Sequence, residues 1–276
     1  MAFVIFVRRS KFFQRRVNPT LINPGRIGRA VLGAGDYWKG FHELLFYSLR
    51  RLGALGKPPV RLVFLKQVYF TGIEALGAVT VIATLTGIVI TTQITSLVGQ
   101  NIALTAKIML WTVVRELGPL LSAIVIIARS SSATASELAS MKIRGEIDHL
   151  RFMGIAPGDY LMVPRIAGIT LSVVAVTFYF QMTAIVMGYA FASVMGFMPF
   201  VKSITGVIST LSMTEVLVSL LKAFVFGLVI SITSCYYGLR ATGTVTAIPR
   251  AATGAVMRNL LTVFLLDGII TYAFFV

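Results

Sequence analysis

The sequence predicts an all-α integral membrane protein with about five transmembrane helices, and three observations lead to this fold class. Hydrophobic residues make up 57% of the 276 residues and charged residues only 13%, with a mean hydropathy of +0.86. This composition lies far from that of a soluble globular domain. The apolar residues gather in runs long enough to cross a bilayer. Positive charge is concentrated before the first of these runs.

The N-terminal segment, residues 1–66, contains 13 of the 25 Lys and Arg residues and two acids, Asp36 and Glu43. Beside a transmembrane helix such a segment marks the cytoplasmic side and meets anionic head groups, an interpretation that we prefer to nucleic-acid binding. Residues 36–55 mix aromatic, aliphatic and basic side chains, which predicts a helix lying in the membrane interface. The short apolar stretch at the start precedes the charges, the reverse of a signal peptide, so we expect it to be retained.

Five spans are predicted from the apolar runs, at about residues 73–97, 103–128, 160–195, 215–239 and 253–276. The first suits a tilted crossing of the bilayer. The second is interrupted by Lys107, Arg115, Glu116 and Pro119, so its charged side chains must face protein or water. The third is long enough to kink or to extend beyond the hydrocarbon. Residues 196–214 predict a connection with a short interfacial helix.

The distribution of Lys and Arg predicts the orientation of the chain. With the N-terminus in the cytoplasm, the inner segments contain 21 of these residues and the outer loops contain two, Lys107 and Lys202. This split satisfies the positive-inside rule and places the C-terminus on the outer side of the membrane.

The most polar stretch after the N-terminal segment lies at residues 128–165, between the second and third spans. Its core is predicted as one helix at residues 134–153. At 100° per residue, one charged stripe contains Glu137, Arg144, Asp148 and Arg151, and a second contains Lys142, Glu146 and His149. A helix with two charged and two apolar faces indicates a position between its own spans and another protein. A solvated loop helix, in which Arg144 pairs with Asp148, is an equally weighted alternative.

Charged residues inside the spans form a second group of candidates. An unpaired charge there costs at least about 2.5–3.5 kcal/mol, so each needs a partner or water. Arg115 and Glu116 lie either near a translocation path or in a structural pair with Asp267 or Arg258 of the fifth span. Asp267 is mid-span, and no cation in its own helix is closer than Arg258. A proton- or ion-coupled carrier would use Arg115, Glu116 and Asp267 as its relay.

The sequence contains no motif for catalysis, metal binding or nucleotide binding. His42 and His149 lack companions at ligand spacing, and the single cysteine, Cys235, excludes an intrachain disulfide and a cysteine metal cluster. The absence of G-x-x-x-x-G-K-[ST] means that the chain does not bind ATP as a P-loop does, and G-x-S-x-G and H-E-x-x-H are also absent. The scattered acids argue against a membrane enzyme acting on lipid. We expect no catalytic residue, metal or cofactor in this chain.

Several motifs, in this order along the chain, resemble the MlaE/YrbE family of ABC lipid-transporter permeases. The strongest are RELGPLLSAIVIIAR at 115–129, SELASMKIRGEIDHLRFMG at 136–154 and YLMVPR at 160–165. QVYFTGIEAL at 67–76, TGIVITTQ at 86–93 and IPRAATGAVMRNLLTVFLLDGIITYAFF at 248–275 support them. The likeness covers roughly residues 60–276 and implies a permease domain at 67–276 behind the basic segment.

This resemblance implies the membrane subunit of an ATP-driven transporter for phospholipid or a related lipid, with no catalysis of its own. The implied partners are a cytoplasmic ABC ATPase that binds ATP-Mg, a second permease copy, identical or paralogous, and an MCE-domain protein on the outer side. The family occurs in bacterial inner membranes and plastid envelopes, and the lack of an evident transit peptide favours the bacterial inner membrane.

In the family, the helix between the second and third spans docks into the ATPase. Glu137, Met141, Asp148 and Gly154 match the family's pattern, and the resemblance implies that they contact the ATPase or brace the coupling helix. Arg144 and Arg151 share the first charged stripe, so these six are the predicted ATPase-coupling residues. The sequence departs from the family at residues 144–146, Arg-Gly-Glu, where a Thr-Glu-Gln-like triplet is common. The glycine also weakens a helix by up to about 1 kcal/mol.

Overall fold

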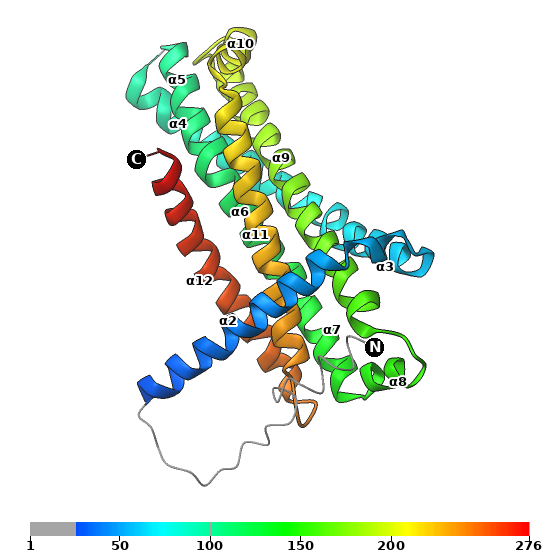
Figure 1. Cartoon of the computed structure of the whole chain (residues 1–276). Helices are drawn as coiled ribbons and strands as arrows, with labels where there is room; N and C mark the ends of the chain where they lie inside the picture. The colour runs from blue at the N-terminus through cyan, green and yellow to red at the C-terminus, as the bar shows by residue number, and fades with distance from the viewer. Residues whose placement is uncertain (1–25, 100, 276) are drawn as a thin grey trace.

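The computed structural model describes residues 26–99 and 101–275, and within them the chain is a bundle of helices with no strand (Figure 1). Five helical stretches are long and apolar enough to cross a membrane, namely Pro58–Val98, Ile102–Ile143, Gly158–Val194, Met213–Leu239 and Ala247–Phe274. The predicted all-α membrane fold with five spans is therefore confirmed. The first 25 residues of the predicted basic segment lie outside the described residues.

The chain reaches the bundle through helix α2 (Arg26–Arg50), the 3-10 turn η2 (Leu52–Gly56) and helix α3 (Pro58–Thr71). Pro58 and Pro59 lie in the first turn of α3, where a missing N–H is tolerated. After the 3-10 turn η3 (Ile73–Ala75), α4 (Leu76–Val98) completes the first long stretch. The predicted first span, at about residues 73–97, corresponds to η3 and α4, and the helical stretch that contains it begins earlier, at Pro58.

One helical stretch forms the second span and continues beyond it. It comprises α5 (Ile102–Met109), the π-helix η4 (Leu110–Leu117), α6 (Gly118–Ile126), the π-helix η5 (Ile127–Ser131) and α7 (Ser132–Ile143). The predicted second span, at about residues 103–128, lies inside this stretch, which continues as a helix to Ile143. Pro119 lies in the first turn of α6, directly after a π-helical segment, so it does not break the stretch.

The predicted single helix at residues 134–153 is wrong, because this segment forms two helices. Gly145 has a φ of 77° and ends α7, and the separate helix α8 (Glu146–Phe152) follows it. Glycine adopts this left-handed conformation without the steric cost that a Cβ would add, and it is the usual residue just after a helix C-terminus. Glu137 and Arg144 therefore do not share one helix face with Asp148 and Arg151.

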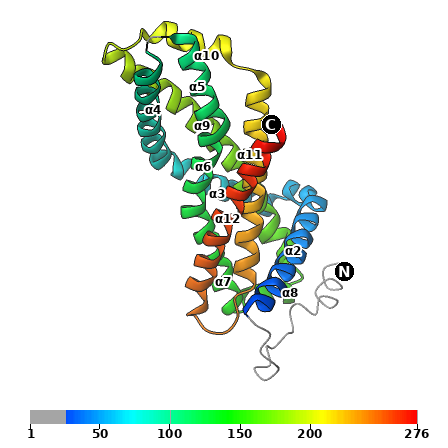
Figure 2. The ribbon, with the colours of Figure 1, turned by 90° about the vertical axis from the view of Figure 1, so that its left-hand side faces the viewer.

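The π-helix η6 (Gly158–Met162) leads into α9 (Val163–Val194), which is followed by α10 (Phe200–Thr210), α11 (Met213–Leu239) and α12 (Ala247–Phe275). Helix α10 is the short helix predicted between the third and fourth spans. Helices α9 and α11 are the most buried of the long helices, whereas the first and last stretches lie at the edge of the bundle. Figure 2 shows α5 and α10 at one end of the bundle and α7 and α8 at the other. We call these the α10 end and the α8 end.

Glycines allow the closest helix contacts in the bundle. A Cβ added to Gly87 of α4 would lie 2.0 Å from the carbonyl oxygen of Ala184 in α9. A Cβ added to Gly188 of α9 would lie 2.6 Å from the carbonyl oxygen of Gly87. Close backbone contact of this kind drives helix association in a bilayer, where lipid chains are as apolar as leucine.

Replacing Gly87 by leucine is expected to force α4 away from α9 and to destabilise the protein by about 1–3 kcal/mol or more, the usual cost of overpacking. The thermal unfolding midpoint of the purified protein measures this effect. Gly77 lies on the same helix with open space around it, so Gly77→Leu is the matched control and should leave the midpoint unchanged. Equal midpoints for the two variants would contradict the close α4–α9 contact.

Candidate functional site

An ion pair joins the second and third spans at the α8 end. Arg165 of α9 donates from Nη2 to Oε1 of Glu137 in α7 over 2.6 Å. Arg165 is buried, whereas the Glu137 side chain is exposed. Glu137 was predicted to contact the ATPase or to brace the coupling helix, and in the structure it pairs within its own chain and fixes α7 against α9.

Asp148 of α8 is the centre of a second set of ion pairs. It accepts a hydrogen bond from Nη1 of Arg151 at 2.8 Å, and its other carboxylate oxygen lies 3.7 Å from Nζ of Lys142 in α7. These contacts hold the α7–α8 hairpin at a defined angle. The alternative prediction that Arg144 pairs with Asp148 is wrong, since the described ion pairs of Asp148 are with Lys142 and Arg151.

The α8 helix ends in two exposed apolar side chains, Phe152 and Met153, whose exposed fractions are 86% and 66%. We call this pair the α8 tip. Gly154, with a φ of 75°, turns the chain away directly after it, and Met141 lies half-buried on α7. Phe152 and Met153 were not among the predicted coupling residues, although an apolar pair at the end of a polar helix is visible in the sequence. Apolar side chains on a protruding element are typical of a protein-binding surface.

Inside the spans, Lys222 of α11 gathers a charge cluster. It is fully buried, and its Nζ donates to Asp267 Oδ1 at 2.8 Å, Glu116 Oε2 at 2.9 Å and Thr271 Oγ1 at 2.7 Å. Arg115 Nε lies 3.3 Å from Glu116 Oε1. The cluster, which comprises these five residues, has two cations and two carboxylates, so its formal charges balance.

This arrangement revises the predicted pairing of the second and fifth spans. Asp267 is connected to Glu116 through Lys222, which was not among the predicted site residues. The available signal was a lysine within the apolar run of the fourth span. Arg258 is not part of the cluster; its guanidinium lies over the ring of Tyr37, 4.6 Å from the centroid.

Side chains from neighbouring helices hold both π-helical segments of the second span. In η4, the carbonyl of Arg115 accepts a hydrogen bond from Lys222 at 3.1 Å, and the carbonyl of Val114 accepts one from Gln181 of α9 at 3.1 Å. In η5, Ser131 Oγ accepts from Asn259 Nδ2 of α12 and from Ser234 Oγ of α11, each at 2.8 Å. These contacts fix the second span to its neighbours at two places along its length, η4 and η5. Segments of π-helix are frequent at functional sites.

The chain is similar to known membrane permeases. A family model described as Permease MlaE matches residues 64–273. A probable ABC transporter permease protein of Rickettsia typhi is 26% identical over 234 residues, which cover 83% of this chain and 90% of that protein. A probable ABC transporter permease protein of Synechocystis is 27% identical over 220 residues, 76% of this chain and 81% of that protein. The chloroplastic protein TRIGALACTOSYLDIACYLGLYCEROL 1 of Arabidopsis thaliana is 28% identical over 218 residues, 76% of this chain and 61% of that protein.

Proposed function

The chain belongs to the MlaE permease family and is a membrane permease with five predicted crossings, and we propose that it is the membrane-spanning subunit of an ABC transporter that uses ATP to move a glycerolipid. The observation that carries this proposal is the unbroken helical stretch from Ile102 to Ile143, which ends in the hairpin that presents the α8 tip. A movement imposed on the tip would therefore reach the opposite end of the bundle.

The α8 tip is the proposed docking point for the ATPase. Phe152 and Met153 are exposed there, and the ion pairs of Asp148 with Lys142 and Arg151 keep the hairpin in shape. Apolar and aromatic anchors that enter a pocket of the partner supply most of the energy at such interfaces. In the orientation that the Lys and Arg distribution favours, the tip faces the cytoplasm, where the partner ATPase would bind ATP-Mg. The Rickettsia and Synechocystis relatives are named as ABC transporter permeases, which supports an ATPase partner.

The Glu137–Arg165 ion pair would pass the movement from α7 to α9. The two residues are 28 positions apart in the sequence and come from the second and third spans. Because Arg165 is buried, the pair is shielded from water and from salt at one end. In this proposal Glu137 acts inside the permease, and the α8 tip makes the contact with the ATPase.

Three further observations support a lipid cargo. The charged groups inside the spans satisfy one another in the charge cluster instead of lining a polar site, and many large apolar side chains on α9 and α12 are exposed. The name of the Arabidopsis relative refers to trigalactosyldiacylglycerol, which is a glycerolipid.

The remaining partners and the location follow from the family resemblance. A second permease copy, identical or paralogous, would complete the transport path, because five spans are few to enclose a lipid. An MCE-domain protein on the outer side would deliver or receive the lipid. We place the transporter in a bacterial inner membrane, with the N-terminus in the cytoplasm and the C-terminus on the outer side.

Mass spectrometry of proteins and lipids tests this proposal on the tagged chain purified from its native membrane in mild detergent. We expect an ABC ATPase, an MCE-domain protein and bound glycerolipid in the purified material. Recovery of the chain alone in several detergents would overturn the proposal of a transporter subunit.

A further inference from the structure

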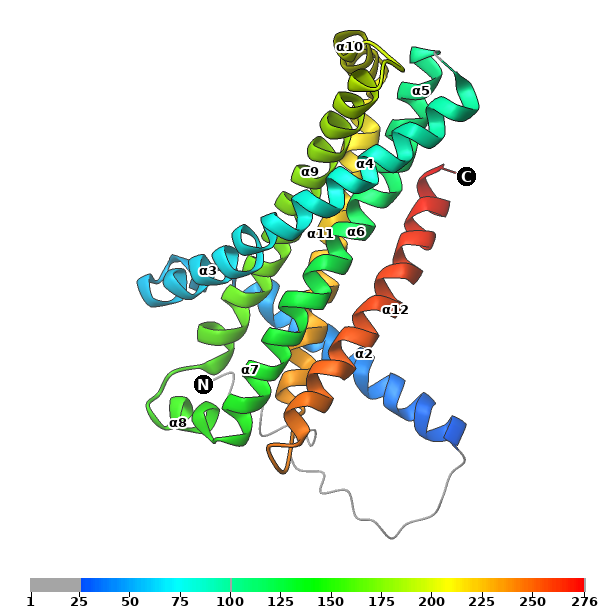
Figure 3. The same ribbon diagram turned by 180° about the vertical axis from the view of Figure 1, so that it is seen from behind.

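Helices α2 and α3 and the turn η2 between them form an elbow beside the bundle, which we define as residues 37–71. Figure 3 shows α3 projecting from the bundle at one side and α2 crossing behind the long helices. The elbow contains six basic residues and one acid, Glu43. All six basic side chains are exposed: Lys39, Arg50, Arg51, Lys57, Arg61 and Lys66.

The elbow is fixed to the rest of the chain at η6. The hydroxyl of Tyr47 donates to Asp159 Oδ1 at 2.6 Å, and Arg51 pairs with the other carboxylate oxygen at 3.4 Å. A Cβ added to Gly158 would lie 2.6 Å from the Tyr47 ring, so the two elements are in close contact. Burial and the Asp159 carboxylate raise the pKa of Tyr47, which keeps its hydroxyl a hydrogen-bond donor. The elbow thus presents its cations from a fixed position.

Asp159 engages only one of these cations. Within the part of the chain that the structure describes, the other five basic residues of the elbow form no ion pair. Arg50 lies over the ring of Phe46, 4.0 Å from its centroid. Exposed apolar side chains stand between the cations, namely Trp38, Phe46, Leu49, Leu52, Leu62, Leu65 and Tyr69. Cations interleaved with exposed aromatic and aliphatic groups are typical of a surface in contact with an anionic leaflet.

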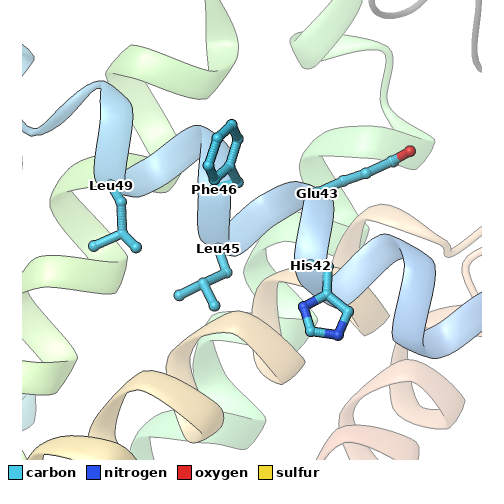
Figure 4. A pocket seen from close by; sticks show the side chains of 5 residues that line it. All are labelled: His42, Glu43, Leu45, Phe46 and Leu49. Carbon is cyan, nitrogen blue, oxygen red and sulfur yellow. The ribbon is translucent and has the colours of Figure 1, made fainter.

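An open groove of about 380 Å³ on α2 adds a place for an acyl chain. It is lined by His42, Glu43, Leu45, Phe46 and Leu49 (Figure 4). Figure 4 shows Leu45 and Leu49 pointing to the same side of the helix, which gives the groove an apolar wall. The guanidinium of Arg50 lies over the ring of Phe46, another lining residue, so a cation stands beside the groove.

We propose that the elbow binds an anionic glycerophospholipid of the surrounding leaflet, with the headgroup phosphate on the exposed cations and an acyl chain along the groove. The elbow has an excess of five positive charges. A Lys or Arg at an anionic surface strengthens binding by about fivefold, and a zwitterionic headgroup lacks the net charge that produces this preference. The lipid bound by the elbow would anchor the protein in the surrounding leaflet and need not be the transported lipid. The proposal therefore does not depend on what the protein transports.

The two tryptophans allow a direct test. The ring of Trp38 stacks on that of His42, with the centroids 5.8 Å apart, and His42 lines the groove, so Trp38 reports on the groove. Trp111 lies in η4 of the second span and is also exposed. The full chain with Trp111→Phe is reconstituted in phosphatidylcholine vesicles that contain a small fraction of brominated phosphatidylglycerol or brominated phosphatidylcholine. We expect the anionic lipid to quench Trp38 about fivefold more strongly than the zwitterionic one. In the Trp38→Phe chain, the two lipids should quench Trp111 equally.

Charge variants at exposed positions complete the experiment. Arg50→Gln, Lys57→Gln and Arg61→Gln together should abolish the preference at Trp38, and replacing Arg50 and Arg61 by lysine should retain it. Lys107→Gln with Lys202→Gln, at the α10 end, is the matched control and should also retain it. Equal quenching of Trp38 by both lipids, or a preference that survives the triple glutamine variant, would overturn the proposal. Absence of quenching by either lipid would also overturn it, since a protein such as a second copy would then cover the elbow.

Discussion

Replacing Lys222 by methionine is expected to lower the free energy of unfolding by about 3–5 kcal/mol, the usual effect of breaking a buried ion pair. Lys222 is fully buried and is within 2.9 Å of both Glu116 and Asp267. Methionine fills nearly the same volume, so the loss comes from Asp267, which is left without a cation, from Glu116, which keeps only Arg115, and from the lost hydrogen bond to the η4 backbone. Thermal unfolding of the purified protein in detergent measures this effect.

Two controls separate charge balance from other causes. The double variant Lys222→Met and Asp267→Asn removes one charge of each sign and should recover most of the lost stability. Lys202 is exposed on α10, so Lys202→Met should leave the unfolding midpoint unchanged. A Lys222→Met variant as stable as the parent would show that the charge cluster does not hold the second, fourth and fifth spans together.

Replacing Phe152 by aspartate is expected to abolish association with the ATPase and, with it, ATP-driven transport. Loss of an aromatic anchor costs about 2 kcal/mol or more of binding free energy, which weakens binding roughly 30-fold. The side chain is 86% exposed in the permease alone, so the substitution should not change the stability of the permease. Copurification of the ATPase with the tagged variant, quantified against the parent, provides the measurement.

The matched control is Val245→Asp, which places the same charge at a 69% exposed apolar position in the loop between α11 and α12. The loop between α11 and α12 lies at the same end of the bundle as the α7–α8 hairpin but is not part of it (Figure 1). Loss of the ATPase from Val245→Asp but not from Phe152→Asp would place the docking surface on the other loop.

The fold class and the spans were predictable from the sequence because hydropathy is a property of single residues averaged over a run. Each of the five stretches is apolar over at least a bilayer thickness, and this signal does not depend on tertiary contacts. The helix ends were less predictable, because Pro58 starts a helix while Gly145 ends one. The residue types suggested a break at both places, but the conformation at each depends on the backbone that follows.

The partners of the charged residues were not predictable, because they are set by how the helices pack. Arg165 meets Glu137, and Lys222 meets Glu116 over 106 positions of sequence. On the predicted helix at residues 134–153, Glu137 and Asp148 would lie in one charged stripe. The turn at Gly145 places them on different helices. The two π-helical segments alter the register of the second span, and no periodicity in the sequence indicated them.

Reconstitution of the permease with the proposed ATPase and MCE-domain partners, in vesicles that contain a fluorescent glycerolipid, tests ATP-driven lipid transport. We expect transfer of the lipid between the bilayer and the MCE-domain protein to require both ATP and the ATPase, and to fail with the Phe152→Asp permease. Transfer that is driven by a proton gradient without ATP, and that is lost when Glu116 or Asp267 is neutralised, would exclude ATP-driven transport and identify the charge cluster as the relay of an ion-coupled carrier.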